Sequence, residues 1–191
     1  MAIFSHYGSA PHPLAMVARS PSTTALSPEQ RANASIIAHL FTAAGWGPEM
    51  AAAAIASAWA ESRLHSEIWG DKSSRPEGCS GGLFQLNRCA GAGMGMTRAD
   101  IEDPALNTRR ILEEVAGSFG RPLRTAWARG ERNVGTLTAF FTTSILRPGN
   151  AAERALQRAA DAHVMFPPAA LAAASPVGHR EGSMDAGAGR R

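Results

Sequence analysis

The sequence has few cysteines and no long apolar segment. With 2 cysteines among 191 residues, a fold held together by several disulfides is excluded. No apolar run approaches the ~18 residues that a membrane-spanning helix needs, so no membrane span is expected. The N-terminal segment also lacks a charged region followed by an unbroken apolar region, and no signal peptide is predicted. Any export must therefore use another route.

The chain also lacks the signatures of common nucleic-acid-binding and metal-binding domains. Its net charge of +3 comes far more from Arg than from Lys, and the arginines are scattered. A basic surface suits an anionic polymer such as cell wall, or serves solubility alone. No RNP, zinc-finger or helix-turn-helix pattern occurs, and aromatic residues are not interleaved with basic ones, so no nucleic-acid partner is expected. His and Cys do not occur at zinc spacing, and neither a metal nor another cofactor is predicted.

The two cysteines, Cys79 and Cys89, lie in a Gly-rich stretch. A disulfide between them would close a short loop if the protein works in an oxidising compartment. Two free thiols in a protein made in the cytosol are the alternative, and the sequence does not choose between the two states.

Length and composition predict one folded domain flanked by two terminal segments outside its core. Hydrophobic residues make up 45% and charged residues 18%, as in ordinary globular domains. Residues 1–26 are rich in Pro, Ser and Ala without a period, and are expected to form a flexible or docking arm. Residues 167–191 are a low-complexity tail, expected to be disordered. The folded domain is therefore predicted over residues 27–166.

Helix signals recur through this body. Ser27, Pro28 and Gln30 form a capping box that starts a helix, and Gly45 ends it. Its expected buried stripe is Ile36, Ile37, Leu40 and Phe41. Pro48 starts a second, Ala-rich helix, whose small side chains predict a central buried position. Residues 63–99 then read as loop or a short hairpin.

Four further segments of regular structure are expected after residue 99. Asp103 caps a helix with Pro104 in its first turn, and Gly117 ends it. Residues 111, 115 and 119 lie four apart and are expected to face the core. Residues 121–130 form a short amphipathic piece, residues 134–146 an apolar helix or strand, and residues 149–165 a final helix. The predicted fold class is mainly α (α+β).

Glu61 lies in the last turn of the second expected helix, in the segment AWAESRLHSEIWG. The negative potential at a helix C-terminus and an apolar wall of Trp59 and Trp69 both favour the protonated form of a carboxyl group. A general acid needs such a form near neutral pH. The alternative is a solvated residue at the helix end, paired with Arg63.

A short apolar segment, SGGLFQLN, follows at residues 80–87. Strand periodicity places Leu83, Gln85 and Asn87 on one face, with Phe84 and Leu86 on the other. The first face would offer amide groups to a polar, acetamido-bearing ligand. The alternative is a short core strand with a tight turn.

An Ala-rich helix that ends in Glu-Ser, followed after a loop by Ser-Gly-Gly-Leu-Phe-Gln, resembles the lysozyme-like superfamily of lytic transglycosylases and phage tail-associated lysozymes. The resemblance implies a lysozyme-like fold, with helices around a central buried helix and a hairpin or loop flap over a glycan cleft. It also implies that Glu61 is the catalytic acid and that Ser62 supports it. The residues predicted to bind the glycan are Ser62, Trp69, Ser80, Gly82, Leu83, Phe84, Gln85 and Asn87.

Two further stretches are similar to that superfamily. DPALN, residues 103–107, is similar to the start of its helix after the cleft, and residues 140–162 are similar to its phage-type ending. Leu146 replaces the acidic residue usual in that ending, and the AYN element of soluble transglycosylases is missing. The resemblance spans roughly residues 48–162 and is closer to phage lysozymes than to housekeeping enzymes.

Glycosidases usually need a second carboxylate. Glu67, Asp71 and Glu77 are available, and Asp71 is the best placed by spacing, with an ordinary exposed turn residue as the alternative. If none is in reach, the resemblance implies that the substrate's acetamido group supplies the nucleophile, with Glu61 acting first as acid and then as base.

The function that the sequence predicts is cleavage of the β-1,4 bond between N-acetylmuramic acid and N-acetylglucosamine in peptidoglycan. The protein would be carried in a phage or phage-like particle, in the tail or delivered to the periplasm and cell wall. Its partners would be glycan strands and, through residues 1–26, other virion or tail proteins. The alternative is a non-catalytic virion or glycan-binding protein that retains the fold. Whether a catalyst would be a hydrolase or a lytic transglycosylase stays open.

Overall fold

A computed structural model describes residues 26–72 and 76–166 of the chain, and nearly all of the expected arm and the whole tail lie outside these residues. Helix α2 (Pro28–Ala43) begins at the predicted capping box: Ser27 Oγ accepts a hydrogen bond from Gln30 N, and Gln30 Oε1 accepts one from Ser27 N. The helix buries Ile37 and Phe41 of the expected stripe, whereas Ile36 and Leu40 are half-buried, because the buried face turns toward Asn33, Ala34 and Ala38.

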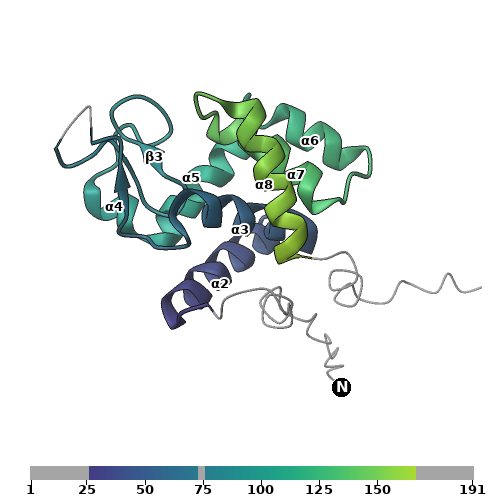
Figure 1. The fold of residues 1–191 in the computed structure, drawn as a ribbon, viewed down its shortest axis with the longest axis horizontal. Helices are drawn as coiled ribbons and strands as arrows, with labels where there is room; N and C mark the ends of the chain where they lie inside the picture. The colour runs from purple at the N-terminus through teal and green to yellow at the C-terminus, as the bar shows by residue number, and fades with distance from the viewer. Residues whose placement is uncertain (1–25, 73–75, 167–191) are drawn as a thin grey trace, which may run out of the picture.

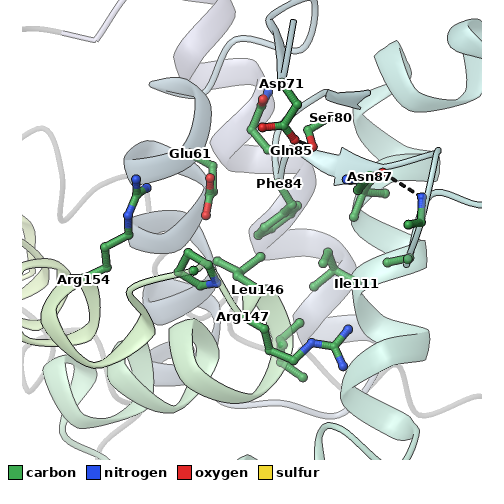
Figure 2. Close-up of a pocket in the computed structure, with 17 residues that line it drawn as sticks. Glu61, Asp71, Ser80, Phe84, Gln85, Asn87, Ile111, Leu146, Arg147 and Arg154 are labelled. Carbon is green, nitrogen blue, oxygen red and sulfur yellow. Dashed lines mark hydrogen bonds between the residues drawn. The ribbon is translucent and has the colours of Figure 1, made fainter. Parts of the chain in front are cut away.

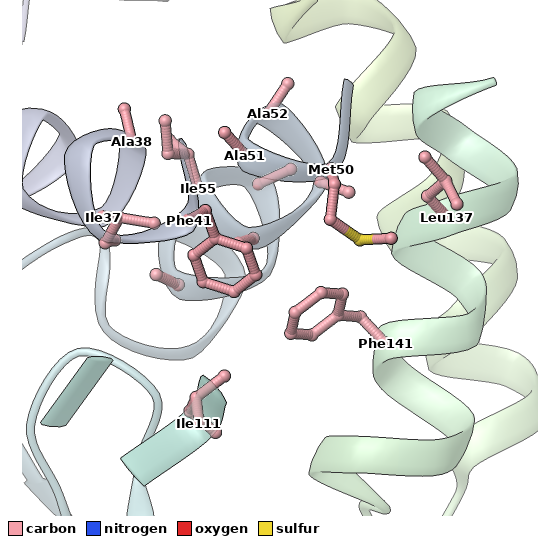
Figure 3. Packing of buried hydrophobic residues seen from close by; sticks show 14 of the residues in the cluster. Ile37, Ala38, Phe41, Met50, Ala51, Ala52, Ile55, Ile111, Leu137 and Phe141 are labelled. Carbon is pink, nitrogen blue, oxygen red and sulfur yellow. The ribbon is translucent and has the colours of Figure 1, made fainter. Parts of the chain in front are cut away.

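Helix α3 (Pro48–Ser62) is the central helix of the molecule (Figure 1). Its residues from Met50 to Ala58 are all buried, and it packs against α2, α7, η1 and α8. Alanine side chains let the backbones of these neighbours approach closely, and Figure 3 shows Met50 of α3 reaching toward Leu137 and the ring of Phe141. The predicted central position is therefore confirmed.

A small antiparallel sheet follows α3, with strand order β1 (Trp69–Gly70), β2 (Ser80–Gly81) and β3 (Leu86–Asn87). Ser80 pairs with both Gly70 and Asn87. The expected strand alternation over SGGLFQLN is wrong, because residues 82–85 form the turn between β2 and β3. Gly82 (φ +74°) and Gln85 (φ +49°) adopt left-handed backbone conformations, which interrupt the two-residue alternation of a strand.

Helices α4 (Arg98–Glu102), α5 (Pro104–Ala116) and α6 (Arg121–Ala128) come next. Asp103 caps α5 as predicted, since its Oδ1 accepts hydrogen bonds from the backbone N–H groups of Ala105 and Leu106. Ile111 and Val115 are buried as expected, but Phe119 is 49% exposed. The prediction for Phe119 is wrong because α5 ends at Ala116, so helical spacing no longer applies there.

Helix α7 (Val134–Phe140) continues into a π-helical turn, η1 (Phe141–Leu146), and α8 (Ala151–Met165) closes the body. The apolar segment over residues 134–146 is therefore helical. In Figure 1 the sheet and α4 lie on one side, α6, α7 and α8 on the other, and α3 between them. The described residues form a mainly helical α+β fold, and no helix among them is long and apolar enough to cross a membrane.

Candidate functional site

A cleft of about 480 Å³ lies between the sheet and the segment that joins η1 to α8 (Figure 2). Glu61, at the end of α3, reaches it from one side. The wall on the sheet side is lined by Asp71, Ser80, Phe84, Gln85, Leu86 and Asn87. The wall on the α8 side is lined by Leu146, Arg147, Pro148, Gly149 and Arg154.

Glu61 forms an ion pair with a residue that the sequence analysis did not single out. Its Oε1 lies 2.7 Å from Nη1 of Arg158 in α8, and the side chains are 15% and 5% exposed. The two groups are close but not aligned as a hydrogen bond, and Nη1 has no hydrogen-bond partner among the described residues. Arg63, the partner considered from the sequence, instead lies over the Trp59 ring, 5.2 Å from its centroid.

The surroundings of Glu61 therefore differ from those expected. Trp69 forms no wall beside it: the indole Nε1 donates a hydrogen bond of 2.8 Å to Glu102, and the guanidinium groups of Arg88 and Arg98 flank the ring. A buried cation, Arg158, thus stands next to the carboxyl group where an apolar wall was expected. The sequence could have indicated that Arg158 is buried, because helical spacing places it on the same face of its helix as Ala155 and Ala162.

The polar groups of the sheet-side wall are held in place by local hydrogen bonds. Asp71, in a left-handed conformation (φ +54°), accepts a hydrogen bond from the hydroxyl group of Ser80. Gln85 Nε2 donates to the carbonyl oxygens of Ile68 (2.9 Å) and Gly82 (3.1 Å), and no described residue donates to its Oε1. Asn87 Oδ1 accepts from the backbone N–H groups of Cys89 and Ala90, each at 2.8 Å. The Oε1 of Gln85 and the Nδ2 of Asn87 thus remain for a ligand.

Asp71 is the one of the three suggested second carboxylates that lines the cleft. Glu67 is exposed outside it, and Glu77 forms an ion pair of 3.5 Å with Arg88. The cleft therefore brings together Glu61 and Asp71, from the end of α3 and the turn after β1.

Four residues predicted to bind a ligand lie behind the cleft wall and not in it: Ser62, Trp69, Gly82 and Leu83. Ser62 is buried and its hydroxyl group donates to the carbonyl oxygen of Leu83 at 2.9 Å, while Leu83 is fully buried in the core. A Cβ atom on Gly82 would lie 2.2 Å from Asn107 Nδ2. These residues support the turn that carries Phe84 and Gln85.

Asn107 holds the same turn from α5. It is fully buried, its Oδ1 accepts a hydrogen bond of 3.1 Å from Phe84 N, and its Nδ2 donates to the carbonyl oxygen of Ile101 at 2.9 Å. The sequence pointed to this residue only as the end of the DPALN stretch.

A disulfide joins Cys79 to Cys89, with a Cα–Cα distance of 5.5 Å. The sequence left open whether these two cysteines form a disulfide or are free thiols, and in the structure they are bonded. The bond spans β2, the turn and β3, and so ties together the segment that forms the sheet-side wall.

No family model, curated protein or solved structure matches this chain. The described residues also contain no cluster of three or more His, Cys, Asp or Glu side chains that would hold a metal ion.

The groups in the cleft suit a polar, ring-containing ligand. Carboxylates at Glu61 and Asp71 provide acid, base or nucleophilic groups. The hydroxyl and amide groups of Ser80, Gln85 and Asn87 match the hydroxyl and acetamido groups of a sugar. The ring of Phe84 adds an apolar surface, as ligand sites commonly have.

Proposed function

We propose that this protein is a peptidoglycan glycosidase that cleaves the β-1,4 bond between N-acetylmuramic acid and N-acetylglucosamine. The observation that carries the proposal is that Glu61, at the end of the central helix, shares one cleft with Asp71 and with a wall of hydroxyl and amide groups. A buried central helix and a small sheet beside its C-terminal end support a lysozyme-like fold as part of the same proposal.

In this proposal Glu61 protonates the oxygen of the leaving sugar. Asp71 lies across the cleft as the candidate nucleophile or base, depending on its separation from Glu61 in the complex with glycan. The substrate's acetamido group is the other possible nucleophile, in which case Glu61 serves first as acid and then as base. Gln85 would hold the sugar rings through its Oε1 and Asn87 through its Nδ2.

The proposed setting is a phage or phage-like particle that delivers the enzyme to the bacterial cell wall. It rests on the resemblance to phage tail-associated lysozymes. Residues 1–26 would attach the domain to other virion or tail proteins. The intact chain is expected to co-purify with assembled particles. Deletion of residues 1–26 should abolish this co-purification.

One observation favours a second candidate function, a non-catalytic virion protein that binds glycan. Oε1 of Glu61 lies 2.7 Å from Nη1 of the buried Arg158, as expected for a carboxylate with a structural role. A glycan-binding protein would retain Glu61 for this ion pair alone, without a catalytic role.

Lysis of purified cell walls by Glu61→Gln tests the proposal. Glutamine keeps an oxygen facing Arg158 but cannot transfer a proton, so the rate is expected to fall at least about 100-fold. Glu67→Gln is the matched control, because Glu67 is exposed outside the cleft, and it should retain wild-type lysis. Circular dichroism of each variant establishes that it is folded. Undiminished lysis by Glu61→Gln would overturn the catalytic assignment.

Product analysis separates the remaining possibilities. Mass spectrometry of the released muropeptides shows 1,6-anhydro ends for a lytic transglycosylase and reducing ends for a hydrolase. Wild-type protein that sediments with cell walls without producing either end would establish the second candidate function and exclude the first.

A further inference from the structure

Two arginines, Arg147 and Arg154, line the α8 side of the cleft. Among the described residues, neither Arg147 nor Arg154 forms an ion pair. Nε of Arg154 donates a hydrogen bond of 2.7 Å to Asn150 Oδ1, and its two Nη groups donate to no described residue. The guanidinium group of Arg147 lies 3.6 Å from the centroid of the Phe119 ring. Both cations thus keep most of their hydrogen-bonding capacity for a ligand.

The backbone holds Arg147 at the cleft. It follows the π-helical turn in a left-handed conformation (φ +48°), and its N–H group donates to the carbonyl oxygen of Thr142 at 2.8 Å. A non-glycine residue seldom adopts this conformation unless its surroundings require it. Figure 2 shows the two side chains at different ends of this wall, with Arg154 beside Glu61 and Arg147 on the far side of Leu146.

The two walls of the cleft differ in charge. Arg158 forms an ion pair with Glu61. The cleft-lining charged residues that have no ion-pair partner among the described residues are Asp71 on the sheet side and Arg147 and Arg154 on the α8 side. Glu153 precedes Arg154 in α8 but does not line the cleft. Its Oε2 accepts a hydrogen bond from Asn150 Nδ2. A ligand that matches this pattern carries negative charge along the edge that faces α8.

We infer that Arg147 and Arg154 form an anion-binding subsite that selects glycans carrying carboxylate groups over neutral glycans of the same linkage. The inference rests on the proposed function and names its substrate class more narrowly. Guanidinium groups bind carboxylates through paired, charge-assisted hydrogen bonds. In peptidoglycan the carboxylate belongs either to the lactyl ether of N-acetylmuramic acid or to the stem peptide attached there, and the two sources are distinguishable by experiment.

Calorimetric titration of the Glu61→Gln protein, which prevents turnover, tests the inference with three probes. These are a neutral chitotetraose, a peptide-free tetrasaccharide of alternating N-acetylglucosamine and N-acetylmuramic acid, and the same tetrasaccharide with stem peptides. The acidic probes are expected to bind about tenfold more tightly than the neutral one at low salt, and the preference should shrink as salt increases.

Arg147→Gln and Arg154→Gln, each in the same background, should reduce the preference for acidic glycan several-fold and leave chitotetraose binding unchanged. Arg121→Gln is the matched control, because Arg121 is exposed on α6 away from the cleft, and it should change neither affinity. A preference that appears only with the stem peptide supports the inference and assigns the carboxylate to the peptide. A preference with the peptide-free probe assigns it to the lactyl group.

Failure of the inference is distinguishable from failure of the proposed function. Equal binding of acidic and neutral tetrasaccharides, or a preference that survives both arginine substitutions, overturns the anion-binding subsite and leaves a glycosidase with another specificity. Absence of binding to all three probes, together with absence of cell-wall lysis by the wild-type protein, overturns the glycosidase itself.

Discussion

Nη1 of Arg158 lies 2.7 Å from Oε1 of Glu61, so an ion pair joins the last helix of the domain to the end of its central helix. The arginine side chain is 5% exposed, and the carboxylate is its one charged partner among the described residues. This contact fixes where the candidate catalytic carboxyl group stands. It also makes that group part of the folding energetics of the domain.

Arg158→Leu is expected to destabilise the domain by about 3 kcal/mol, because it leaves Glu61 without its counter-charge in a poorly hydrated position. Glu61→Gln added to Arg158→Leu should restore part of this loss, since no charge is then left unpaired. Urea unfolding of the wild type, both single variants and the double variant gives the coupling free energy. Strictly additive losses would show that the ion pair does not contribute to stability.

Gly82→Ala is expected to destabilise the turn between β2 and β3 by more than about 2 kcal/mol, since it combines backbone strain with a clash. A Cβ atom there would lie 2.2 Å from Asn107 Nδ2 and 2.3 Å from the carbonyl oxygen of Ile101. Gly95→Ala is the matched control: Gly95 has a similar φ of +82°, but a Cβ atom would meet nothing within 4 Å. Its cost should be only about 1 kcal/mol, from backbone strain alone. Equal losses in thermal melts of the two variants would contradict the predicted clash.

Reduction of the Cys79–Cys89 disulfide is expected to lower the free energy of unfolding by about 2–3 kcal/mol, because the unfolded chain gains the entropy of an open loop. The same loss should follow from replacement of both cysteines by serine. Since the bond ties the sheet-side wall, glycan affinity should fall as well, while the far-ultraviolet spectrum of the helices stays unchanged. Thermal melts with and without reductant measure the first effect. No change in the melting temperature on reduction would contradict it.

Glu102 contributes a pH-dependent part of the stability. The hydrogen bond from Trp69 Nε1, with a smaller contribution from Arg98, lowers the pKa of Glu102 below its ordinary value of 4.5. A lowered pKa in the folded state stabilises the fold above the ordinary value, and this contribution disappears as the pH falls through the folded-state pKa. The wild type should therefore be more stable than Glu102→Gln at pH 7, and the difference should close at a pH below 4.5. Unfolding curves of both proteins from pH 7 downward test this, and a difference independent of pH would refute it.

Local signals in the sequence predicted the starts of three helices, α2, α3 and α5. The Ser27 capping box, the Asp103 cap and the Ala-rich run after Pro48 each depend on residues close together in the chain, so they could be read without knowledge of the fold. The placement of Glu61 in the last turn of its helix was predictable for the same reason.

Contacts between distant segments were not predictable in this way. The pairing of Glu61 with Arg158 joins residues far apart in the chain, and neither residue type indicates the other. The turn over residues 82–85 was misread as a strand because Gly82 and Gln85 both adopt left-handed conformations, and the residue type of Gln85 does not indicate this. The exposure of Phe119 depends on where the preceding helix ends.

The sequence by itself determined the mainly helical class, the starts of α2, α3 and α5 and the carboxyl group at the end of the central helix, since capping, helix propensity and periodicity act over a few residues. Only the tertiary structure decided which side chains share the cleft. Asp71, Arg147 and Arg154 line it, whereas Ser62, Trp69, Gly82 and Leu83 lie behind its wall. The reason is physical: α8 packs against α3, the sheet lies across the cleft from it, and the chain path through the turns determines which side chains face the space between them.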